Sequence, residues 1–341
     1  MQLKIHQFEL PLRHPFTISR ETIRVQPTII VELQHQGMSG FGESTTNAYY
    51  GVTEQSLRHS LETIRELVQQ SDWTTPVELW EAASAEIDDS FALCALDLAA
   101  HDLWGKRQGQ SVHALWGLNT ESNPLSNYTI GIDQMEVMIS KMQEFGDWPI
   151  YKIKLGTERD IEIVRTLREH TDAVFRVDAN CAWTAQQTID YSGPLKELGV
   201  EFIEQPLAAD AIDQMPAVYA QSQLPLIADE NCLVVDDVEK CVGCFHGINI
   251  KLVKCGGLTP ARKMIQTARE NHLQVMVGCM TESTVGISAI AQLLPLLDYV
   301  DMDGAALLQS DIAEGCKVVR GVCHYPQTAG TGVTLTGPPE R

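Results

Sequence analysis

The sequence predicts an α/β fold: a parallel barrel of the (β/α)8 type, in a modified (β/α)7β form, joined to a smaller α+β domain. Two observations favour this fold. From residue 125 onward, short apolar runs alternate with helical periodicity, as in a parallel sheet whose strands are connected by helices. Charged residues also close successive apolar runs at intervals of about 25 residues, the length of one strand, one helix and two loops. The 341 residues leave room for a second domain beside the barrel.

Residues 1–123 are expected to form the smaller α+β domain. Antiparallel strands are predicted over residues 2–10 and 27–34, followed by a turn at Gly37 and a return strand. Between the first two strands, the segment at about 13–24 is polar, basic and without clear period. Three segments with helical periodicity follow: 54–69, 76–86 and 91–107.

Residues 124–303 are expected to form the barrel. The predicted strands are the apolar runs 126–130, 150–154, 174–178, 202–204, 226–229, 248–252, 274–278 and 299–302. The predicted helices are 135–145, 158–170, 185–198, 210–221, 235–241, 260–271 and 282–294. The C-terminal segment, 304–341, has no room for a full eighth helix. It is expected to return to the amino-terminal domain.

Charged residues stand where the predicted strands end. In chain order they are Lys154, Asp178, Glu204, Asp229 and Lys254. The carboxyl ends of barrel strands form one face, and the catalytic groups of a barrel come from several strands at once. These five charges, dispersed along the chain, are therefore expected to converge on one mouth.

The three acids Asp178, Glu204 and Asp229 are candidate ligands of one Mg²⁺ ion. Carboxylate oxygens without histidine or thiol form the hard ligand set that Mg²⁺ prefers. Open positions on the ion would take water and a substrate carboxylate, whose developing charge the metal would neutralise. Asn180 and Gln205 are candidates for hydrogen bonding around the ligands. The alternative, for each acid taken alone, is that it caps the following helix.

Lysines flank the acids in sequence. Lys152 and Lys154 alternate on one strand, so both side chains point to the same side. A neighbouring cation and burial favour the neutral amine that a catalytic base requires. Lys154 is the predicted first base, and Lys152 is expected to contact the substrate. Lys254, just past the predicted sixth strand, is the predicted second base.

A lysine on each face of a bound carbon acid permits removal of a proton from one side and its return from the other. This arrangement predicts racemisation or epimerisation. Lys251, three residues before the predicted second base, is instead expected to pair with Asp229 or Glu230 beneath the site.

Asp301 and Asp303 end the predicted eighth strand and share one side of it. A carboxylate pair at the mouth suits a substrate ammonium group. A second metal site is the alternative, because the ligands are again oxygen atoms. Glu282 begins the predicted seventh helix, where it either caps the helix or has a role that the sequence leaves open.

The composition excludes several classes of partner. Lysine and arginine number 25 against 45 aspartates and glutamates, and the net charge of −20 argues against nucleic acid or an anionic membrane. No signal peptide or membrane span is expected. Nine cysteines without framework spacing indicate a reducing cytoplasm. Cys241 and Cys244 have CxxC spacing, but no second pair follows, so packed thiols are favoured over a zinc or redox site.

With these residues identified, the chain resembles the enolase superfamily, specifically the muconate-lactonising subgroup and its dipeptide epimerases. The motifs that carry the resemblance are Lys152-Ile153-Lys154, Asp178-Ala179-Asn180, Ile203-Glu204-Gln205-Pro206, Ala228-Asp229-Glu230, Asn249-Ile250-Lys251, Lys254 and Gly256-Gly257. Enolase-superfamily sites use a lysine or histidine base together with Mg²⁺, in agreement with the roles assigned to the barrel residues.

The resemblance implies that the amino-terminal domain is a capping domain whose loop, here about 13–24, closes over the barrel and contacts the distal part of the substrate. Residues 47–51 would form a second capping segment. Asp301-Met302-Asp303 is similar to the pattern that binds the free ammonium group of a dipeptide in this subgroup. Arg20 or Arg24 would contact a glutamate side chain, as a loop arginine does in some Ala-Glu epimerases.

The resulting hypothesis is a cytoplasmic enzyme with one Mg²⁺ per site that epimerises the carboxy-terminal residue of a dipeptide, by default L-Ala-D/L-Glu. Lys154 and Lys254 would exchange the α-proton through an enediolate. An o-succinylbenzoate synthase or a muconate-type cycloisomerase would use the same ligands with Lys154 alone as base. A non-catalytic ligand-binding barrel is the remote alternative. The sequence leaves open the preferred side chains, homo-oligomer formation and whether Mn²⁺ replaces Mg²⁺.

Overall fold

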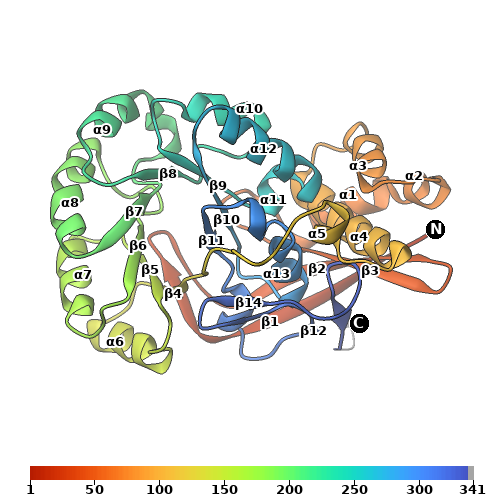
Figure 1. Ribbon diagram of the computed structural model, residues 1–341, viewed down its shortest axis with the longest axis horizontal. Coiled ribbons are helices and arrows are strands. Elements are labelled where there is room, and N and C mark those ends of the chain that lie inside the picture. Colours follow the sequence, from red (N-terminus) through yellow and green to blue (C-terminus); the bar gives the residue numbers. More distant parts are fainter. Residues whose placement is uncertain (337–341) are drawn as a thin grey trace.

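A computed structural model describes residues 1–336 and confirms the predicted barrel (Figure 1). Eight parallel strands pair in the order β11-β10-β9-β8-β7-β6-β5-β4, and a bridge between Ser126 and Val300 joins the two ends of this order. The strands are β4 (Tyr128–Ile130), β5 (Ile150–Lys154), β6 (Val174–Asp178), β7 (Val200–Glu204), β8 (Leu226–Ala228), β9 (Gly247–Ile250), β10 (Gln274–Gly278) and β11 (Tyr299–Asp301). Each predicted strand is therefore present.

Helices cover the outer side of the strands (Figure 1). They are α6 (Met135–Glu144), α7 (Asp160–Arg168), α8 (Ala185–Glu197), α9 (Met215–Gln221), α10 (Val235–Val238), α12 (Leu258–Glu270) and α13 (Thr284–Ala291). The predicted sixth strand differs from the structure, because β9 ends at Ile250. A one-turn helix, α11 (Leu252–Cys255), begins directly after Lys251.

The amino-terminal domain places helices against an antiparallel sheet. Its strands are β1 (Gln2–Ile18), β2 (Glu21–His35) and β3 (Met38–Thr45), in the order β1-β2-β3. Its helices are α1 (Glu54–Thr63), α2 (Arg65–Gln70), α3 (Pro76–Ser84), α4 (Ser90–Gln108) and α5 (Val112–Leu115). The helix predicted over 54–69 divides into α1 and α2 at Ile64. Apolar side chains of the sheet and of α4 share one core.

The segment 13–24 forms the end of a long β-hairpin, where the sequence predicts a loop. Strand β1 continues to Ile18 and β2 begins at Glu21, with Phe16 paired to Ile23. Phe16 and Ile23 are partly buried and pack against an apolar cluster of the neighbouring elements. Tertiary packing of this kind stabilises strands that local sequence pattern does not reveal.

Buried acids join the capping domain to the barrel. Asp97 of α4 accepts hydrogen bonds from the amide and hydroxyl of Thr259, at 2.8 and 2.7 Å, where α12 begins. Glu43 of β3 accepts hydrogen bonds from the amides of Ser283 and Gly286, where α13 begins. A carboxylate at a helix amino terminus is electrostatically favourable. These contacts hold the capping domain beside the mouth of the barrel.

The C-terminal segment contacts the capping domain. The amide of Thr331 donates to Asp102, and the carbonyl of Gly330 accepts a hydrogen bond from Val112. The segment forms the short strands β12 (Ala313–Glu314), β13 (Lys317–Val319), β14 (Val322–His324) and β15 (Thr334–Leu335). Residues 337–341 of the predicted segment lie outside the described residues. The domain boundaries given by the sequence stay predictions.

Burial of Glu282 beside Glu43 makes stability depend on pH. Burial, followed by the charge of Glu43, raises the pKa of Glu282 to about 8. The folded protein therefore keeps a proton that a glutamate with the ordinary pKa of 4.5 releases. Because the folded state binds more protons, its stability decreases as the pH rises from about 4.5 to about 8. We predict that Glu282→Gln flattens this dependence, and its amide oxygen can still accept the hydrogen bond from Met280.

Urea unfolding of the wild type and Glu282→Gln between about pH 5 and pH 8 measures this effect. The exposed Glu158→Gln is the matched control, for which we expect the wild-type pH dependence. Parallel curves for the wild type and Glu282→Gln would contradict the prediction.

Candidate active site

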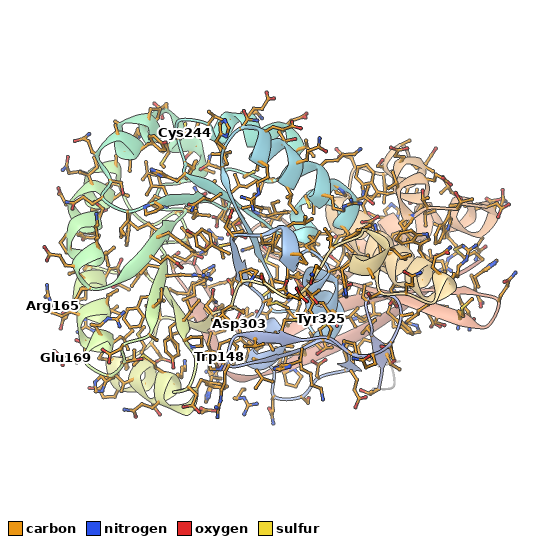
Figure 2. All side chains as sticks on the ribbon, in the orientation of Figure 1. Trp148, Arg165, Glu169, Cys244, Asp303 and Tyr325 are labelled. Carbon is orange, nitrogen blue, oxygen red and sulfur yellow. The ribbon has the colours of Figure 1, made fainter. Side chains whose placement is uncertain are left out.

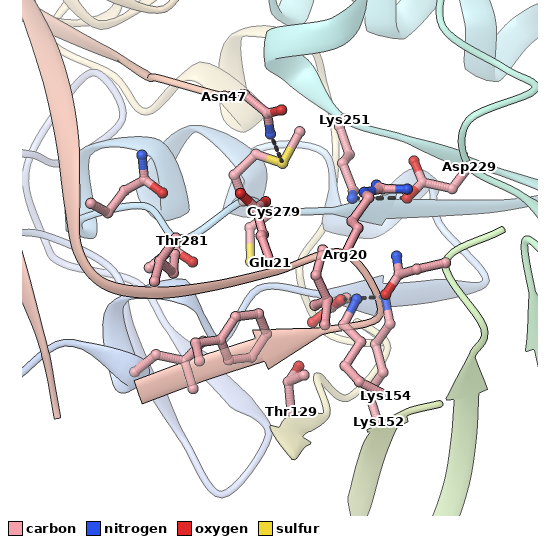
Figure 3. Close-up of a pocket in the computed structure, with 18 of the residues that line it drawn as sticks. Arg20, Glu21, Asn47, Thr129, Lys152, Lys154, Asp229, Lys251, Cys279 and Thr281 are labelled. Atoms are coloured by element: carbon pink, nitrogen blue, oxygen red, sulfur yellow. Dashed lines mark hydrogen bonds and ion pairs between the residues drawn. The ribbon is translucent and has the colours of Figure 1, made fainter. Parts of the chain in front are cut away.

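A pocket opens at the carboxyl ends of the barrel strands, and the capping domain covers one side of it (Figure 3). Together with the space that opens to solvent, its volume is about 800 Å³. The residues that line it include Phe16, Ile18, Arg20, Ile23, Lys152, Lys154, Asp229, Lys251, Cys279, Asp301 and Asp303.

The structure brings the three predicted metal-binding acids together. Asp178 ends β6, Glu204 ends β7 and Asp229 follows β8, so they stand on three adjacent strands. One carboxylate oxygen from each lies within 4.8 Å of the others, and all three side chains are buried. Nearby, the buried oxygens Asn180 Oδ1 and Glu230 Oε2 have no hydrogen-bond donor among residues 1–336. An all-oxygen set of three acids, with two unsatisfied acceptors beside it, fits a hard divalent cation such as Mg²⁺.

Lys152 lies beside the acids and contacts three carboxylates. Its Nζ lies 2.7 Å from Glu204, 2.9 Å from Asp301 and 3.2 Å from Asp178. Burial alone lowers the pKa of Lys152, but the charges of the carboxylates, Asp301 first, outweigh burial and raise it well above the usual value. The ammonium is thereby held in its charged form, which suits contact with an anion.

Lys154 and Lys251 approach the pocket from opposite sides of the barrel (Figure 3). Lys154 ends β5 and Lys251 directly follows β9, and three strands separate β5 from β9 in each direction around the ring. The Nζ of Lys154 lies 2.7 Å from Asp178, and that of Lys251 lies 2.9 Å from Asp229. Burial lowers the pKa of Lys251 and the charge of Asp229 raises it, with a net upward shift. A molecule bound over the acids would lie between the two amines.

The structure does not place Lys254 among the residues that line the pocket. Lys254 lies within α11, and its Nζ contacts the carbonyl oxygens of Asp229 and Cys232. The interval of about 25 residues selects Lys254, but β9 ends at Ile250, so Lys251 holds the strand-end position. Because Lys251 lines the pocket and Lys254 does not, we propose Lys251 as the second base in place of Lys254.

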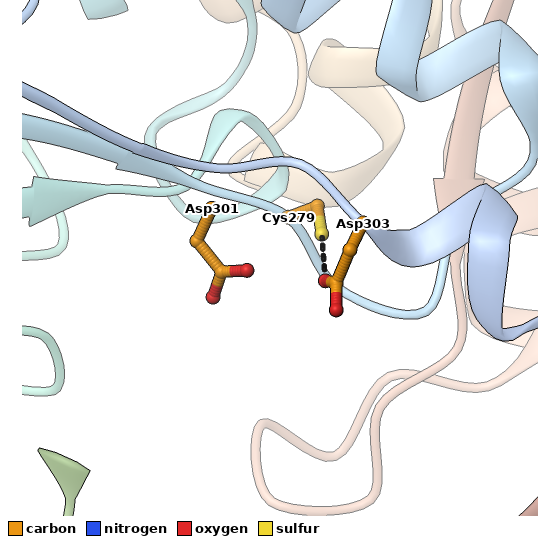
Figure 4. A group of neighbouring side chains, drawn as sticks. All are labelled: Cys279, Asp301 and Asp303. Carbon is orange, nitrogen blue, oxygen red and sulfur yellow. Dashed lines mark hydrogen bonds between the residues drawn. The ribbon is translucent and has the colours of Figure 1, made fainter. Parts of the chain in front are cut away.

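Asp301 and Asp303 form one end of the pocket. Asp301 accepts a hydrogen bond from the side-chain amide of Asn127 at 2.7 Å, and Asp303 accepts one from the backbone amide of Thr129 at 2.6 Å. The thiol of Cys279 lies 3.9 Å from Asp303 Oδ1 (Figure 4). Burial raises the pKa of Cys279 well above that of a free thiol. Sequence reasoning missed Cys279, which has no motif and is identified only by its contact.

Of the two predicted loop arginines, only Arg20 reaches the pocket. It lies in the tip of the β1–β2 hairpin and donates a hydrogen bond to Glu230 at 2.7 Å. Its guanidinium also stacks 4.0 Å from the ring centroid of Tyr49. Arg24 is exposed on β2 and does not line the pocket. The hairpin tip is thus tied to the residue after Asp229.

Part of the pocket lining is apolar, and we call this part the apolar wall. It is formed by Phe16, Ile18 and Ile23 of the hairpin together with Met280 and Leu307. Sequence reasoning missed Phe16, Ile18 and Ile23 because it treats the hairpin segment as a loop. The alternation of Phe16 and Ile18 along the chain is the signal that indicates a strand face. The wall offers an apolar environment to a substrate side chain.

Backbone contacts support the acids. The side-chain oxygen of Gln205 accepts hydrogen bonds from the amides of Asp229 and Asn231, at 2.9 and 3.2 Å. The backbone amide of Asn180 donates a hydrogen bond to Asp178 Oδ1 at 2.8 Å. The Gln205 side chain and the Asn180 backbone therefore contact the acids or the turn that carries Asp229.

The remaining sequence features lie away from this pocket. Cys244 lies at the periphery of the molecule, whereas Asp303 lies near its middle (Figure 2). Neither Cys241 nor Cys244 belongs to a group of three metal-binding side chains in the part of the chain that the structure describes. Within residues 1–336, every helix is too short or too polar to cross a membrane.

Comparison with known proteins adds family information to this geometry. Residues 1–117 match the family model of the mandelate racemase/muconate lactonizing enzyme N-terminal domain, and residues 134–338 match the enolase C-terminal domain-like model. The chain is 55% identical to an L-Ala-D/L-amino acid epimerase of Flavobacterium johnsoniae, covering 98% of this chain and 100% of the relative. It is 39% identical to an L-Ala-D/L-Glu epimerase of Bacteroides thetaiotaomicron, covering 98% and 88%.

A solved structure has the same architecture. The dipeptide epimerase of Enterococcus faecalis, in complex with Mg and the dipeptide L-Leu-L-Tyr, superposes with a TM-score of 0.91 at 28% identity. The similarity covers 98% of this chain and 99% of that chain. Both the barrel and the capping domain are therefore shared.

Loss of the Arg20 side chain should loosen the hairpin tip. A hydrogen bond to a charged group at a partly exposed site is worth about 1 kcal/mol, so we predict about fivefold faster amide hydrogen exchange around residues 18–21 in Arg20→Met. Arg24→Met removes an exposed arginine from the same hairpin and should leave the exchange rates unchanged. Equal exchange rates at the tip in Arg20→Met and the wild type would show that the contact with Glu230 does not hold the hairpin.

Proposed function

The chain belongs to the mandelate racemase/muconate lactonizing enzyme family of the enolase superfamily, and we propose that it is a Mg²⁺-dependent dipeptide epimerase. It inverts the α-carbon of the carboxy-terminal residue of its substrate. The observation that carries this proposal is the placement of Lys154 and Lys251 on opposite sides of a pocket that also contains buried carboxylates.

Two opposed amines allow inversion without moving the substrate. One lysine, as the neutral amine, takes the α-proton from its face of the carbon. The other, as the ammonium, returns a proton to the opposite face, and the carbon–hydrogen bond that breaks is replaced by one of opposite configuration. In the reverse direction Lys154 and Lys251 exchange roles, so one site converts either epimer into the other.

Asp178, Glu204 and Asp229 would hold the metal. Mg²⁺, when bound, supplies positive charge that offsets these carboxylates and stabilises the substrate carboxylate as the α-proton leaves. Lys152, whose ammonium contacts Glu204 and Asp178, adds a fixed positive charge on the same side of the pocket. Gln205 supports the arrangement by holding the backbone of Asp229.

Asp301 and Asp303 would bind the amino terminus of the dipeptide. Both line the pocket and both are buried. A pair of carboxylates matches an ammonium group through charge-assisted hydrogen bonds. The substrates of o-succinylbenzoate synthases and muconate-type cycloisomerases have no ammonium group, so this pair favours the epimerase over those alternatives.

The relatives indicate the substrate class. The proteins from Flavobacterium johnsoniae and Bacteroides thetaiotaomicron are named for dipeptides that begin with L-Ala. We propose L-Ala-X as substrate, with glutamate as one accepted X and uncharged residues as others, because the pocket combines Arg20 with the apolar wall. A cytoplasmic location agrees with nine cysteines that are all free thiols.

The proposal is tested by ¹H NMR of L-Ala-X dipeptides in D₂O with the enzyme and Mg²⁺. We expect loss of the α-proton signal of residue X together with appearance of the second diastereomer. Chelation with EDTA should stop both changes, and added Mg²⁺ should restore them. No exchange from any dipeptide, alongside turnover of an o-succinylbenzoate precursor or a muconolactone, would overturn the epimerase assignment.

Removal of one base should leave half of the exchange chemistry intact. An amine on one face reaches only the diastereomer whose α-proton points to that face. We therefore predict that Lys154→Ala still exchanges the α-proton of one diastereomer and Lys251→Ala that of the other. Epimerisation should decrease by about 10³-fold in both variants, within the range of general acid–base catalysis.

The exposed Lys240→Ala is the control, and we expect wild-type exchange of both diastereomers from it. The measurement is NMR of each purified diastereomer in D₂O. If Lys154→Ala and Lys251→Ala both lost α-proton exchange from the same diastereomer, the two bases could not lie on opposite faces of the α-carbon.

A further inference from the structure

We infer that Lys254 is a positioning residue: it fixes the Asp229 carboxylate and the turn that follows it, and it takes no part in proton transfer. The inference rests on the proposed function in one respect, the treatment of Asp229 as a metal ligand. The proposed chemistry leaves Lys254 without a role.

The ammonium of Lys254 is surrounded by acceptors. Its Nζ lies 2.5 Å from Asp229 Oδ1 and 2.6 Å from the carbonyl oxygen of Asp229. The carbonyl oxygens of Cys232 and Asn249 lie at 3.3 and 3.5 Å. An ammonium has three N–H donors and a carbonyl or carboxylate oxygen can only accept, so these contacts occupy the donors of Lys254. The Lys254 side chain is therefore fixed by the Asp229 carboxylate and by the backbone carbonyl oxygens around it.

The local backbone directs Lys254 to this place. Lys254 lies in α11, which ends at Gly256 with a φ of 97°, a left-handed conformation that favours glycine. At the next residue, Gly257, an added Cβ would lie 2.4 Å from the Asp97 carboxylate of the capping domain. The capping domain thus packs directly on the turn behind Lys254. The side chain of Lys254 is only 1% exposed.

Lys251 and Lys254 contact different oxygens of the Asp229 carboxylate. Lys251 contacts Oδ2 from the side of the pocket, and Lys254 contacts Oδ1. With both oxygens held by separate cations, the plane of the carboxylate is fixed before any metal binds. Preorganisation of a ligand by its hydrogen-bond partners typically improves metal affinity by about 10- to 100-fold.

The position of Lys254 also separates it from the reacting carbon. It lines a second cleft, together with Tyr50, Asp88 and Phe91 of the capping domain and Leu233 of the barrel. The pocket that contains Lys154 and Lys251 does not include Lys254 among its lining residues. A base at Lys254 would have to leave four acceptors to reach a substrate in that pocket.

The test combines metal affinity with stereochemically resolved exchange in Lys254→Met. Mn²⁺ is the probe, and its binding to the substrate-free protein is followed by electron paramagnetic resonance. We expect Mn²⁺ affinity to fall by about 10- to 100-fold. Exchange in D₂O should fall by the same factor for both diastereomers at limiting Mg²⁺, and should recover as Mg²⁺ is raised.

Matched variants separate positioning from folding. Lys240→Met makes the same substitution at an exposed site and should bind Mn²⁺ like the wild type. Lys254→Gln keeps a side-chain donor for the carbonyl oxygens and should lose less affinity than Lys254→Met. If Lys254→Met does not fold, the Mn²⁺ affinity of Lys254→Gln decides the question. We expect this affinity to be lower than that of the wild type but still measurable.

Two results would overturn the inference. Loss of exchange from one diastereomer only, with unchanged Mn²⁺ affinity, would make Lys254 a base. Wild-type affinity and exchange in Lys254→Met would show that its contacts with Asp229 have no effect on the site. Failure of the proposed function is distinguishable, because it removes exchange from the wild type while the Mn²⁺ titrations still report on Lys254.

Discussion

Burial of several carboxylates at one end of the barrel is the constraint on which the rest of the site depends. Asp178, Glu204 and Asp229 are placed together by three adjacent parallel strands. Buried charges are costly unless opposite charges and hydrogen bonds compensate them. Lysines supply this compensation. The Nζ atoms of Lys152 and Lys154 lie within 3.2 Å of the Asp178 carboxylate. The lysines that compensate the acids therefore also line the pocket.

The capping domain completes the site from outside the barrel. Its β1–β2 hairpin contributes the apolar wall and Arg20, while Asp97 and Glu43 anchor its helix and sheet to the starts of α12 and α13. Because these anchors are buried hydrogen bonds to charged groups, their loss is costly. The barrel thus provides the lysines and acids that line the pocket, and the hairpin of the capping domain provides Arg20 and three apolar residues of its lining.

The barrel and the acid cluster could be predicted from the sequence because each depends on local pattern and chain spacing. The second lysine could not, since an interval of about 25 residues does not distinguish the end of a strand from the first turn after it. Lys251 and Lys254 differ in position because β9 ends at Ile250, so that only Lys251 lines the pocket. The hairpin that carries Arg20 was missed as well: the alternation of Phe16 and Ile18 is a weak signal, and its strands depend on contacts with distant residues.

The most direct test of the account is a crystal structure of the protein with Mn²⁺ and a dipeptide. The account predicts an anomalous peak at about 2.0–2.2 Å from oxygens of Asp178, Glu204 and Asp229. It also predicts that the α-carbon of the carboxy-terminal residue lies between Lys154 and Lys251, with about 3–3.5 Å from each Nζ to the carbon. A dipeptide whose α-carbon faces only one of these lysines, or a metal bound elsewhere, would contradict the account.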